Sequence, residues 1–290
     1  MLNQKFAKHI NVNKPTIIIY KLSETDFFSN TSNKFVFMAE ENSETILIEV
    51  QDILLNNLDT QFHTEVNLSK NATVHHAVFY VSPTENLDFR HHLTVQQQKD
   101  SSYQLSLFNL GKANQSGDIQ IHLNEPNAST KIKVLTLANF NQRKNIQLTV
   151  HHHQPNCQSD IMTRGVMAGL SKSEFTGKII VDTDASKTNA KLENKNLLLS
   201  DKADVNSKPE LEIYNNDIQC THGATVGYLE LEALFYLKTR GIPEVEAKQL
   251  LIQAFIKPIQ ESLPEAIRKQ YDELTVSMQI PLEDLSHECL

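Results

Sequence analysis

The sequence predicts a mainly β protein that ends in a small α-helical unit. Roughly 200 residues consist of short runs rich in β-branched and aromatic residues, bounded by polar turn residues. Glycine is scarce and absent before Gly111, so the turns must rely on Asn, Asp and Ser, which tolerate left-handed or self-bonded backbone. The pattern changes at Gly227, after which apolar residues recur at helical spacing.

The predicted strands follow one another along the chain. Alternation is clear in several of them; in residues 118–123, for example, Ile119, Ile121 and Leu123 share one face. The predicted runs are Thr16–Tyr20, Lys34–Met38, Thr45–Val50, Gln61–Val66, Thr73–Val81, Tyr103–Phe108, Asp118–His122, Lys131–Leu137, Asn145–Val150, Gly177–Val181, Asn196–Leu199, Leu211–Tyr214 and Asp217–Cys220.

A β-sandwich, a closed barrel and a parallel β-helix all fit this series of strands. Two features favour the solenoid. The turns use single polar residues instead of the Asn-Gly pairs typical of hairpins, and strands recur to the end without helical crossovers. No short sequence repeat is visible.

Three helices are predicted after the strands. The first begins at Leu229 and ends at Gly241, and the second opens at Pro243, a residue tolerated at a helix start. Pro258 is expected to end or kink the second helix because it removes one backbone hydrogen bond. Pro264–Leu274 is the third. The expected apolar face of the second helix is Ala247, Leu250, Leu251, Ala254 and Phe255.

Composition excludes some classes of function. The 290 residues carry a net charge of −8, which argues against nucleic-acid binding because phosphates require a basic surface. No run approaches the ~20 apolar residues of a membrane span. The three cysteines, Cys157, Cys220 and Cys289, are too few and too widely spaced for a disulfide framework. We therefore expect a soluble, cytoplasmic protein.

The tract His151-His152-His153 is the first candidate for chemistry. Neighbouring side chains of a strand point to opposite faces, so only His151 and His153 can converge. Zinc requires three or four ligands, and the one nearby cysteine, Cys157, lies beyond Pro155. A structural or solvent-facing role is therefore expected for this tract.

The segment Cys220-Thr221-His222 is the second candidate. Cys220 and His222 are two residues apart at the end of a predicted strand, so their side chains share a face. The residues alone leave two interpretations open: a partial metal site completed from elsewhere, or a buried cysteine beside a hydrogen-bonded histidine. Familiar nucleophile, phosphate-loop and zinc-protease motifs are missing, which favours a protein that is not an enzyme.

The region around Cys220 resembles the SufB/SufD family of the SUF iron–sulfur cluster assembly machinery. At this junction SufB members carry Glu-His-Glu-Ala, whereas this chain has Cys220-Thr221-His222-Gly223-Ala224, so it is similar to SufD. Met167-Ala168-Gly169 departs from the Leu-Asp-Gly more common in SufD members. The matching blocks are His153–Cys157, Arg164–Val166, Phe175–Ile179, Lys187–Ala190, Asn196–Ser200, Pro209–Tyr214, Asp217, Cys220–Gly227 and Glu232–Ile242.

The resemblance implies a right-handed parallel β-helix (solenoid) followed by a small C-terminal α-helical domain. We expect an N-terminal segment of short strands over residues 1–60, the β-helix core over 61–226 and the helical domain over 227–290. SufD members carry a longer helical N-terminal region, so functions of that region are expected to be missing here. Buried positions are expected at Ile179, Val181, Leu198 and Ile213.

The resemblance also implies a non-enzymatic scaffold subunit. Its β-helix is expected to pair with a SufB-like subunit, and its C-terminal helices with a SufC-like ATPase. No stable cofactor is expected; His222, with Cys220 as a weaker candidate, would contact iron or a nascent cluster transiently at the SufB interface. The expected partner-binding residues are Tyr236, Arg240, Gly241, Ile242 and Pro243.

Two alternatives remain. A stand-alone β-helix enzyme acting on a polysaccharide would need an exposed groove lined with acids and with Arg or Lys. A homodimeric structural protein would pair through an open strand edge, because an unpaired edge is a template for association.

Overall fold

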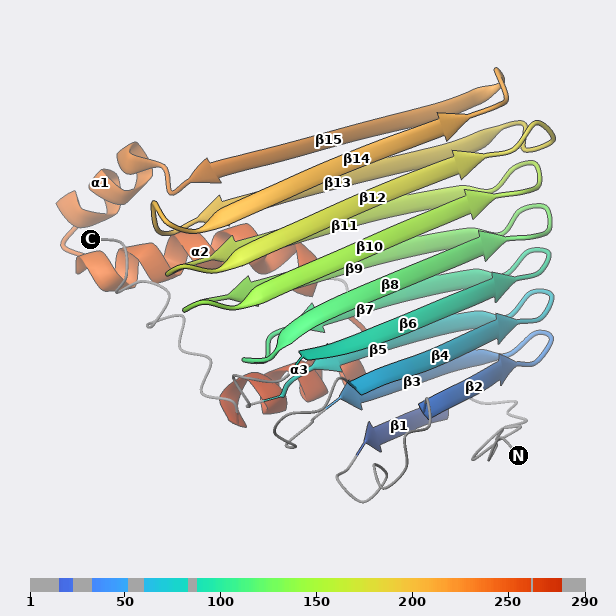
Figure 1. The fold of residues 1–290 in the computed structure, drawn as a ribbon, viewed down its shortest axis with the longest axis horizontal. Coiled ribbons are helices and arrows are strands. Elements are labelled where there is room, and N and C mark those ends of the chain that lie inside the picture. Colours follow the sequence, from blue (N-terminus) through green and yellow to red (C-terminus); the bar gives the residue numbers. More distant parts are fainter. Residues whose placement is uncertain (1–15, 23–32, 52–59, 83–87, 262, 278–290) are drawn as a thin grey trace.

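The computed structural model describes residues 16–22, 33–51, 60–82, 88–261 and 263–277. Within them the chain winds into a parallel β-solenoid, in which successive strands alternate between two sheets (Figure 1). Every strand pair in both sheets is parallel. The predicted mainly β fold, with a parallel β-helix and C-terminal helices, is confirmed.

The odd-numbered strands form an eight-stranded sheet, called here the odd sheet, and the even-numbered strands form a seven-stranded even sheet. The odd sheet contains β1 (Thr16–Leu22), β3 (Glu44–Gln51), β5 (Thr73–Tyr80), β7 (Ser102–Asn109), β9 (Ser129–Ala138), β11 (Gln158–Met167), β13 (Thr188–Leu198) and β15 (Ile218–Tyr228). The even sheet contains β2 (Asn33–Ala39), β4 (Thr60–Leu68), β6 (Asp88–Gln97), β8 (Asn114–Leu123), β10 (Arg143–His152), β12 (Lys172–Val181) and β14 (Asp204–Ile213). Strands β1 to β3 belong to the same two sheets, so the solenoid includes described parts of the 1–60 segment.

Each predicted run overlaps a strand of the structure, but β6 and β11 have no predicted counterpart. Their inward-facing residues explain the omission. The buried face of β6 includes His91 and Gln97, and that of β11 includes Ser159 and Thr163. Polar side chains on the buried face weaken the alternation of apolar and polar residues by which a strand is recognised.

One corner of the solenoid has a repeated conformation. At every corner from an even strand to the next odd strand between β2 and β13, one residue adopts a left-handed backbone. Its N–H donates to a carbonyl of the neighbouring coil, as Asn71 N–H does to Lys99 O at 2.9 Å. Asn and Asp tolerate this conformation better than other non-glycine residues. The predicted use of Asn and Asp in place of glycine is confirmed. The corner residues are Asn42, Asn71, Asp100, Asn127, Asn156 and Lys187.

The interior is built from side chains stacked in register on successive coils. One such ladder in the even sheet consists of fully buried aliphatic residues on five consecutive strands, and the strand pairing places each directly beside the next. Burial of this apolar surface is the main term that stabilises the solenoid. The ladder consists of Val66, Val95, Ile121, Val150 and Ile179.

Helices α1 (Leu231–Thr239), α2 (Glu244–Gln260) and α3 (Glu265–Ser277) follow β15. Helices α2 and α3 lie against the outer face of the odd sheet and form a second apolar core with it; Tyr271 contacts Phe108 with ring centroids 4.9 Å apart. Figure 1 shows α1 beyond the end of β15. Within the described residues, no helix combines the length and hydropathy needed to cross a membrane.

Helix α2 differs from its prediction in two respects. The helix does not end at Pro258 but continues to Gln260. Lys133, on strand β9 of the sheet beneath the helix, donates from Nζ to Pro258 O at 2.7 Å. The buried face of α2 is also rotated: Ile252, Ile256 and Ile259 are buried, whereas Leu250 is 47% exposed. Apolar residues form two stripes along this helix, and contact with the sheet determines which stripe is buried.

The expected burial of Ile179, Val181 and Leu198 is confirmed, since all three are less than 10% exposed. The expectation for Ile213 is wrong, because this residue is 40% exposed. Ile213 stacks on the buried Val181, but β14 is the last strand of the even sheet, so no further coil covers it.

The difference in burial between Ile179 and Ile213 predicts different losses of stability when each residue is replaced by alanine. Ile179→Ala removes a fully buried side chain and should lower the free energy of unfolding by about 2–5 kcal/mol, through lost burial and the cavity left behind. Ile213→Ala, the matched control, should cost less than about 1 kcal/mol. Urea unfolding followed by circular dichroism measures both, and equal costs would contradict an open end at β14.

Candidate functional site

The solenoid ends without a cover over its last coil. Among the described strands, β14 and β15 each pair on one side only, with β12 and β13. The backbone groups on their other sides face outward, as at any sheet edge. Large apolar side chains are exposed on the same coil, which is unusual for a surface that remains in water. They are Ile213, Tyr214, Val226 and Tyr228, each at least 40% exposed.

Cys220 and His222 lie on β15, on the side that faces inward in the preceding coils. The strand pairing stacks Cys220 on Ala190 and His222 on Leu192, and both of those residues are buried. The predicted common face of the two residues follows from this register. His222 is exposed because no coil lies above it, whereas Cys220 is half-buried and packs against the interior core.

The three thiols are in different environments. Burial raises the pKa of the Cys157 thiol to about 11, and its side chain is fully enclosed, so it is no nucleophile. Burial also raises the pKa of Cys220, with a smaller opposing effect from a backbone hydrogen bond at Ala190. Cys289 lies outside the described residues. No third metal-ligating side chain joins Cys220 and His222 within the part of the chain that the structure describes.

Three of the expected partner-binding residues form the turn between α1 and α2: Gly241, Ile242 and Pro243. Gly241 has a φ of +85°, its N–H donates to Lys238 O, and Ile242 N–H donates to Leu237 O. This pair of hydrogen bonds is a Schellman motif, which ends a helix, and Pro243 caps the start of α2. The geometry therefore gives all three residues of the turn a local structural role.

Tyr236 and Arg240 differ from those turn residues. Tyr236 is 56% exposed, and the Arg240 guanidinium lies 5.2 Å from the centre of its ring, a cation–π contact on the surface. Helix α1 buries none of its residues, and Leu231 and Phe235 are also exposed. Helix α1 therefore has an exposed apolar surface of the kind found at protein-binding sites.

An open groove of about 1070 Å³ lies between α1 and the adjacent corners of the solenoid. Phe140, Leu170 and Tyr228 contribute exposed apolar surface to it, and Lys202 and Glu244 are among its charged residues. The groove thus continues the apolar surface of the open end toward α1.

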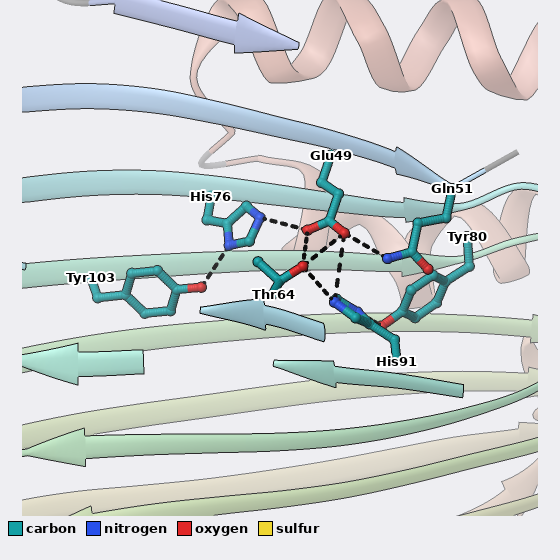
Figure 2. Close-up of polar contacts among 7 residues, drawn as sticks. All are labelled: Glu49, Gln51, Thr64, His76, Tyr80, His91 and Tyr103. Carbon is teal, nitrogen blue, oxygen red and sulfur yellow. Dashed lines mark hydrogen bonds and ion pairs between the residues drawn. The ribbon is translucent and has the colours of Figure 1, made fainter. Parts of the chain in front are cut away.

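The interior contains a polar cluster that the sequence interpretation missed. Figure 2 shows Glu49 surrounded by Gln51, Thr64, His76 and His91. Gln51 Nε2 donates to Glu49 Oε1 at 2.6 Å, and Thr64 Oγ1 donates to the same carboxylate at 3.0 Å. His76 Nε2 and His91 Nε2 lie 3.4 and 3.6 Å from its oxygens.

Two tyrosines complete the cluster. Tyr80 OH is 2.7 Å from His91 Nδ1, and Tyr103 OH is 2.8 Å from His76 Nδ1. The one signal in the sequence is that Thr64 and His91, and His76 and Tyr103, are each 27 residues apart, close to the length of one coil.

The cluster controls the ionisation of its members. Burial works against the charge of Glu49, but the two histidines and the Gln51 hydrogen bond outweigh it and hold the pKa of Glu49 at about 2. Burial lowers the pKa of His91 to about 4, with a smaller opposing effect from Glu49. Glu49, His76 and His91 are at most 1% exposed, so a polysaccharide does not reach this carboxylate–histidine set.

The amino-acid sequence of this open-ended solenoid matches a known family model and several known proteins. A family model described as "SUF system FeS cluster assembly, SufBD core domain" matches residues 22–255. The chain is similar to an iron–sulfur cluster assembly SufBD family protein of Synechocystis, with 33% identity over 70% of this chain and 45% of that protein.

Two similar proteins are named iron–sulfur cluster assembly protein SufD. The Escherichia coli protein is 30% identical over 74% of this chain and 51% of its own length. The Bacillus subtilis protein is 26% identical over 91% of this chain and 60% of its own length. The chain therefore spans about half the length of these curated relatives.

The buried cluster generates a prediction about acid stability. Glu49 and His91 both have lowered pKa values in the fold, so the unfolded chain takes up their protons first as the pH falls. Stability should therefore fall between pH 6.5 and 4 through His91, and between pH 4.5 and 2 through Glu49.

The substitution Glu49→Gln isolates the contribution of Glu49 to stability between pH 4.5 and 2. At pH 7 it should cost about 1–3 kcal/mol, because at least one buried donor loses its acceptor. The deficit relative to the unsubstituted protein should shrink as the pH falls from 4.5 to 2, where Glu49 itself becomes protonated. Glu174→Gln, at an exposed position on β12, is the control and should stay within about 0.5 kcal/mol. Chemical unfolding at several pH values measures this, and a deficit independent of pH would contradict an ionised Glu49.

Proposed function

The chain belongs to the SufB/SufD core-domain family of the SUF iron–sulfur cluster assembly system, and we propose that it acts there as a SufD-like scaffold subunit without catalysis of its own. The observation that carries the proposal is the uncovered last coil, where two strand edges and four exposed apolar side chains end the solenoid. Such a surface supports binding of another protein.

The partner proposed for this surface is a SufB-like subunit. Strand edges β14 and β15 offer backbone groups at the spacing of a parallel sheet, so a second solenoid can continue both sheets across the interface. The exposed Ile213 and Val226 would then be covered by the partner as the preceding coils are covered by their neighbours. In isolation, the same edge would pair two copies of this chain.

The cargo of the interface is proposed to be iron or a nascent iron–sulfur cluster, held transiently by His222. His222 stacks above the interior column and would face directly into the interface once a partner covers it. An imidazole ligates iron reversibly, and a cysteine thiolate of the partner would supply a further ligand. Cys220 is half-buried with a raised pKa, which makes it the weaker ligand candidate.

The second partner proposed is a SufC-like ATPase bound by the C-terminal helices. Helix α1 supports this, because all its side chains remain at least partly exposed and because Tyr236 and Arg240 are joined in a surface cation–π pair. Aromatic residues and arginine are enriched at the centres of protein interfaces. We place this assembly in the cytoplasm.

A stand-alone polysaccharide-active enzyme remains the alternative from another class. The buried Glu49 cluster is a carboxylate–histidine set, but it is closed to polymers. The apolar character of the open end favours the scaffold. Assays of the purified chain on polysaccharides would test this, and any turnover lost in Glu49→Gln would favour the enzyme.

The role of His222 is tested in the reconstituted complex with its SufB-like and SufC-like partners. His222→Ala should leave melting and partner binding unchanged and should lower cluster formation at least about tenfold, because an essential ligand is removed. Thr221→Ala, the neighbour on the opposite face of β15, is the control. Cluster yield is read from visible absorption and iron analysis. If His222→Ala forms clusters normally, the site lies on the partner.

The role of α1 is tested by binding to the ATPase. Arg240→Ala and Tyr236→Ala should each weaken binding by about 1–2 kcal/mol, roughly tenfold, if the pair lies at the centre of the interface. Lys257→Ala, an exposed residue of α2, should not change the affinity. Calorimetric titration gives the affinities, and thermal melting checks the fold. Unchanged binding with normal melting would remove the pair from the interface.

A further inference from the structure

Three histidines meet on the outer face of the even sheet, away from the open end. His122 lies on β8 and His151 on β10, and the strand pairing places these two residues side by side. His153 follows two residues after His151 and so points to the same face. All three are half-buried, and one ligand atom from each lies within 4.8 Å of the others.

The spacing of these nitrogen atoms fits one metal ion. His122 Nδ1 and His153 Nε2 are 3.2 Å apart. A zinc ion bonded to tetrahedral nitrogen ligands at about 2.0–2.1 Å holds neighbouring nitrogens roughly 3.4 Å apart. The rings of His151 and His153 also lie side by side, with centroids 3.7 Å apart. Each of the three imidazoles thus has a ligand atom within 4.8 Å of those of the other two.

Asp182, directly after β12, orients two of these rings. Its Oδ1 is 2.8 Å from His151 Nε2, and its Oδ2 is 2.8 Å from His153 Nδ1. A neutral imidazole that donates its N–H to a carboxylate keeps the other ring nitrogen unprotonated and available as a ligand. This carboxylate–histidine arrangement is the usual outer shell of zinc sites.

The charge state of the cluster also suits a cation. Burial and the nearby His153 and His151 lower the pKa of His122, which favours the unprotonated ring that a metal ion needs. Partial burial of Asp182 opposes ionisation, but the hydrogen bonds from His151 and His153 outweigh it and keep the pKa of Asp182 below its usual value. The Asp182 carboxylate behind the three imidazoles provides one negative charge for the ion.

We propose that His122, His151 and His153 form a binding site for one divalent ion of the zinc class, with Asp182 orienting two of the three ligands. Three nitrogen ligands and a position open to solvent match a three-histidine zinc site. The site lies on β8 and β10, whereas the proposed cluster contact lies on β15 of the other sheet. It is therefore independent of the proposed function and does not require a partner protein.

The sequence alone did not support this site. Only His151 and His153 converge within the tract, and the third ligand lies 29 positions before His151, beyond a complete coil. The structure also explains His152, which points inward, is fully buried and contacts Ser159 Oγ at 2.9 Å. The tract thus divides into two outward ligands and one interior residue.

The test is a titration of Zn²⁺ into the full chain, purified without a polyhistidine tag, stripped with a chelator and kept reduced. We expect one ion per chain with a dissociation constant of about 1 µM or below. Binding should raise the melting temperature, because the ion binds only the folded state. Titration with Co²⁺ should give tetrahedral visible absorption without a thiolate charge-transfer band.

Five variants determine where the ion binds. His122→Ala and His153→Ala should each weaken binding at least about 100-fold, and Asp182→Asn should weaken it about 10–100-fold. His63→Ala, whose ring stacks on His92 on the same outer face, is the matched control and should bind normally. His222→Ala should also bind normally.

Two outcomes would overturn the proposal. One is the absence of binding at 100 µM Zn²⁺ by a folded chain. The other is binding that survives in His122→Ala and His153→Ala or disappears in His222→Ala, which would assign the ion to another site. A thiolate band with Co²⁺ would likewise assign the ion to a site with a cysteine ligand. If a ligand variant melts abnormally, His122→Gln and His153→Gln replace the alanine variants and are held to the same criterion.

Discussion

Each coil of the solenoid relies on the coils beside it, both for backbone hydrogen bonds and for covering its side chains. The parallel register places like positions of successive coils directly on one another, as in the ladder from Val66 to Ile179. A strand in such a sheet is satisfied only when both of its edges are paired. The end of the solenoid is therefore a surface where backbone hydrogen-bonding groups and apolar side chains face solvent.

The same register determines where polar residues go. Residues that alternate along a strand face either the interior or the solvent, so adjacent histidines are separated by the sheet itself. His91 enters the Glu49 cluster, whereas His92 lies on the outer face beside Asp118 at 3.4 Å. His152 is likewise buried between the two outward histidines of its tract. The interior cluster is closed and structural, and the outer histidines remain accessible to a ligand.

The C-terminal helices cover one face of the solenoid and leave other surfaces uncovered. Helices α2 and α3 cover the outer face of the odd sheet through a continuous apolar core, so this face is complete within one chain. Helix α1 and the open end have no such cover among the described residues. These two uncovered surfaces lie next to each other at the groove formed by Tyr228 and Leu231. An assembly with two partners would use both.

The sequence by itself determined the class of fold, the change from strands to helices near Gly227 and the family resemblance around Cys220 and His222. These depend on local alternation, turn residues and contiguous motifs, which are readable over a few residues. It did not reveal β6 and β11, whose buried faces carry His91 and Ser159, nor which stripe of α2 meets the sheet.

Only the tertiary structure decided which residues of different coils become neighbours. His122 and His151, or Glu49 and His91, are brought together by the register of parallel strands. That register depends on the length of every intervening coil, which varies from the 26 positions between Asp88 and Asn114 to the 32 between Lys172 and Asp204. Because this spacing is irregular, one sequence shows no clear repeat. The contacts follow from the stacking of whole coils, a property of the complete fold and not of any local pattern.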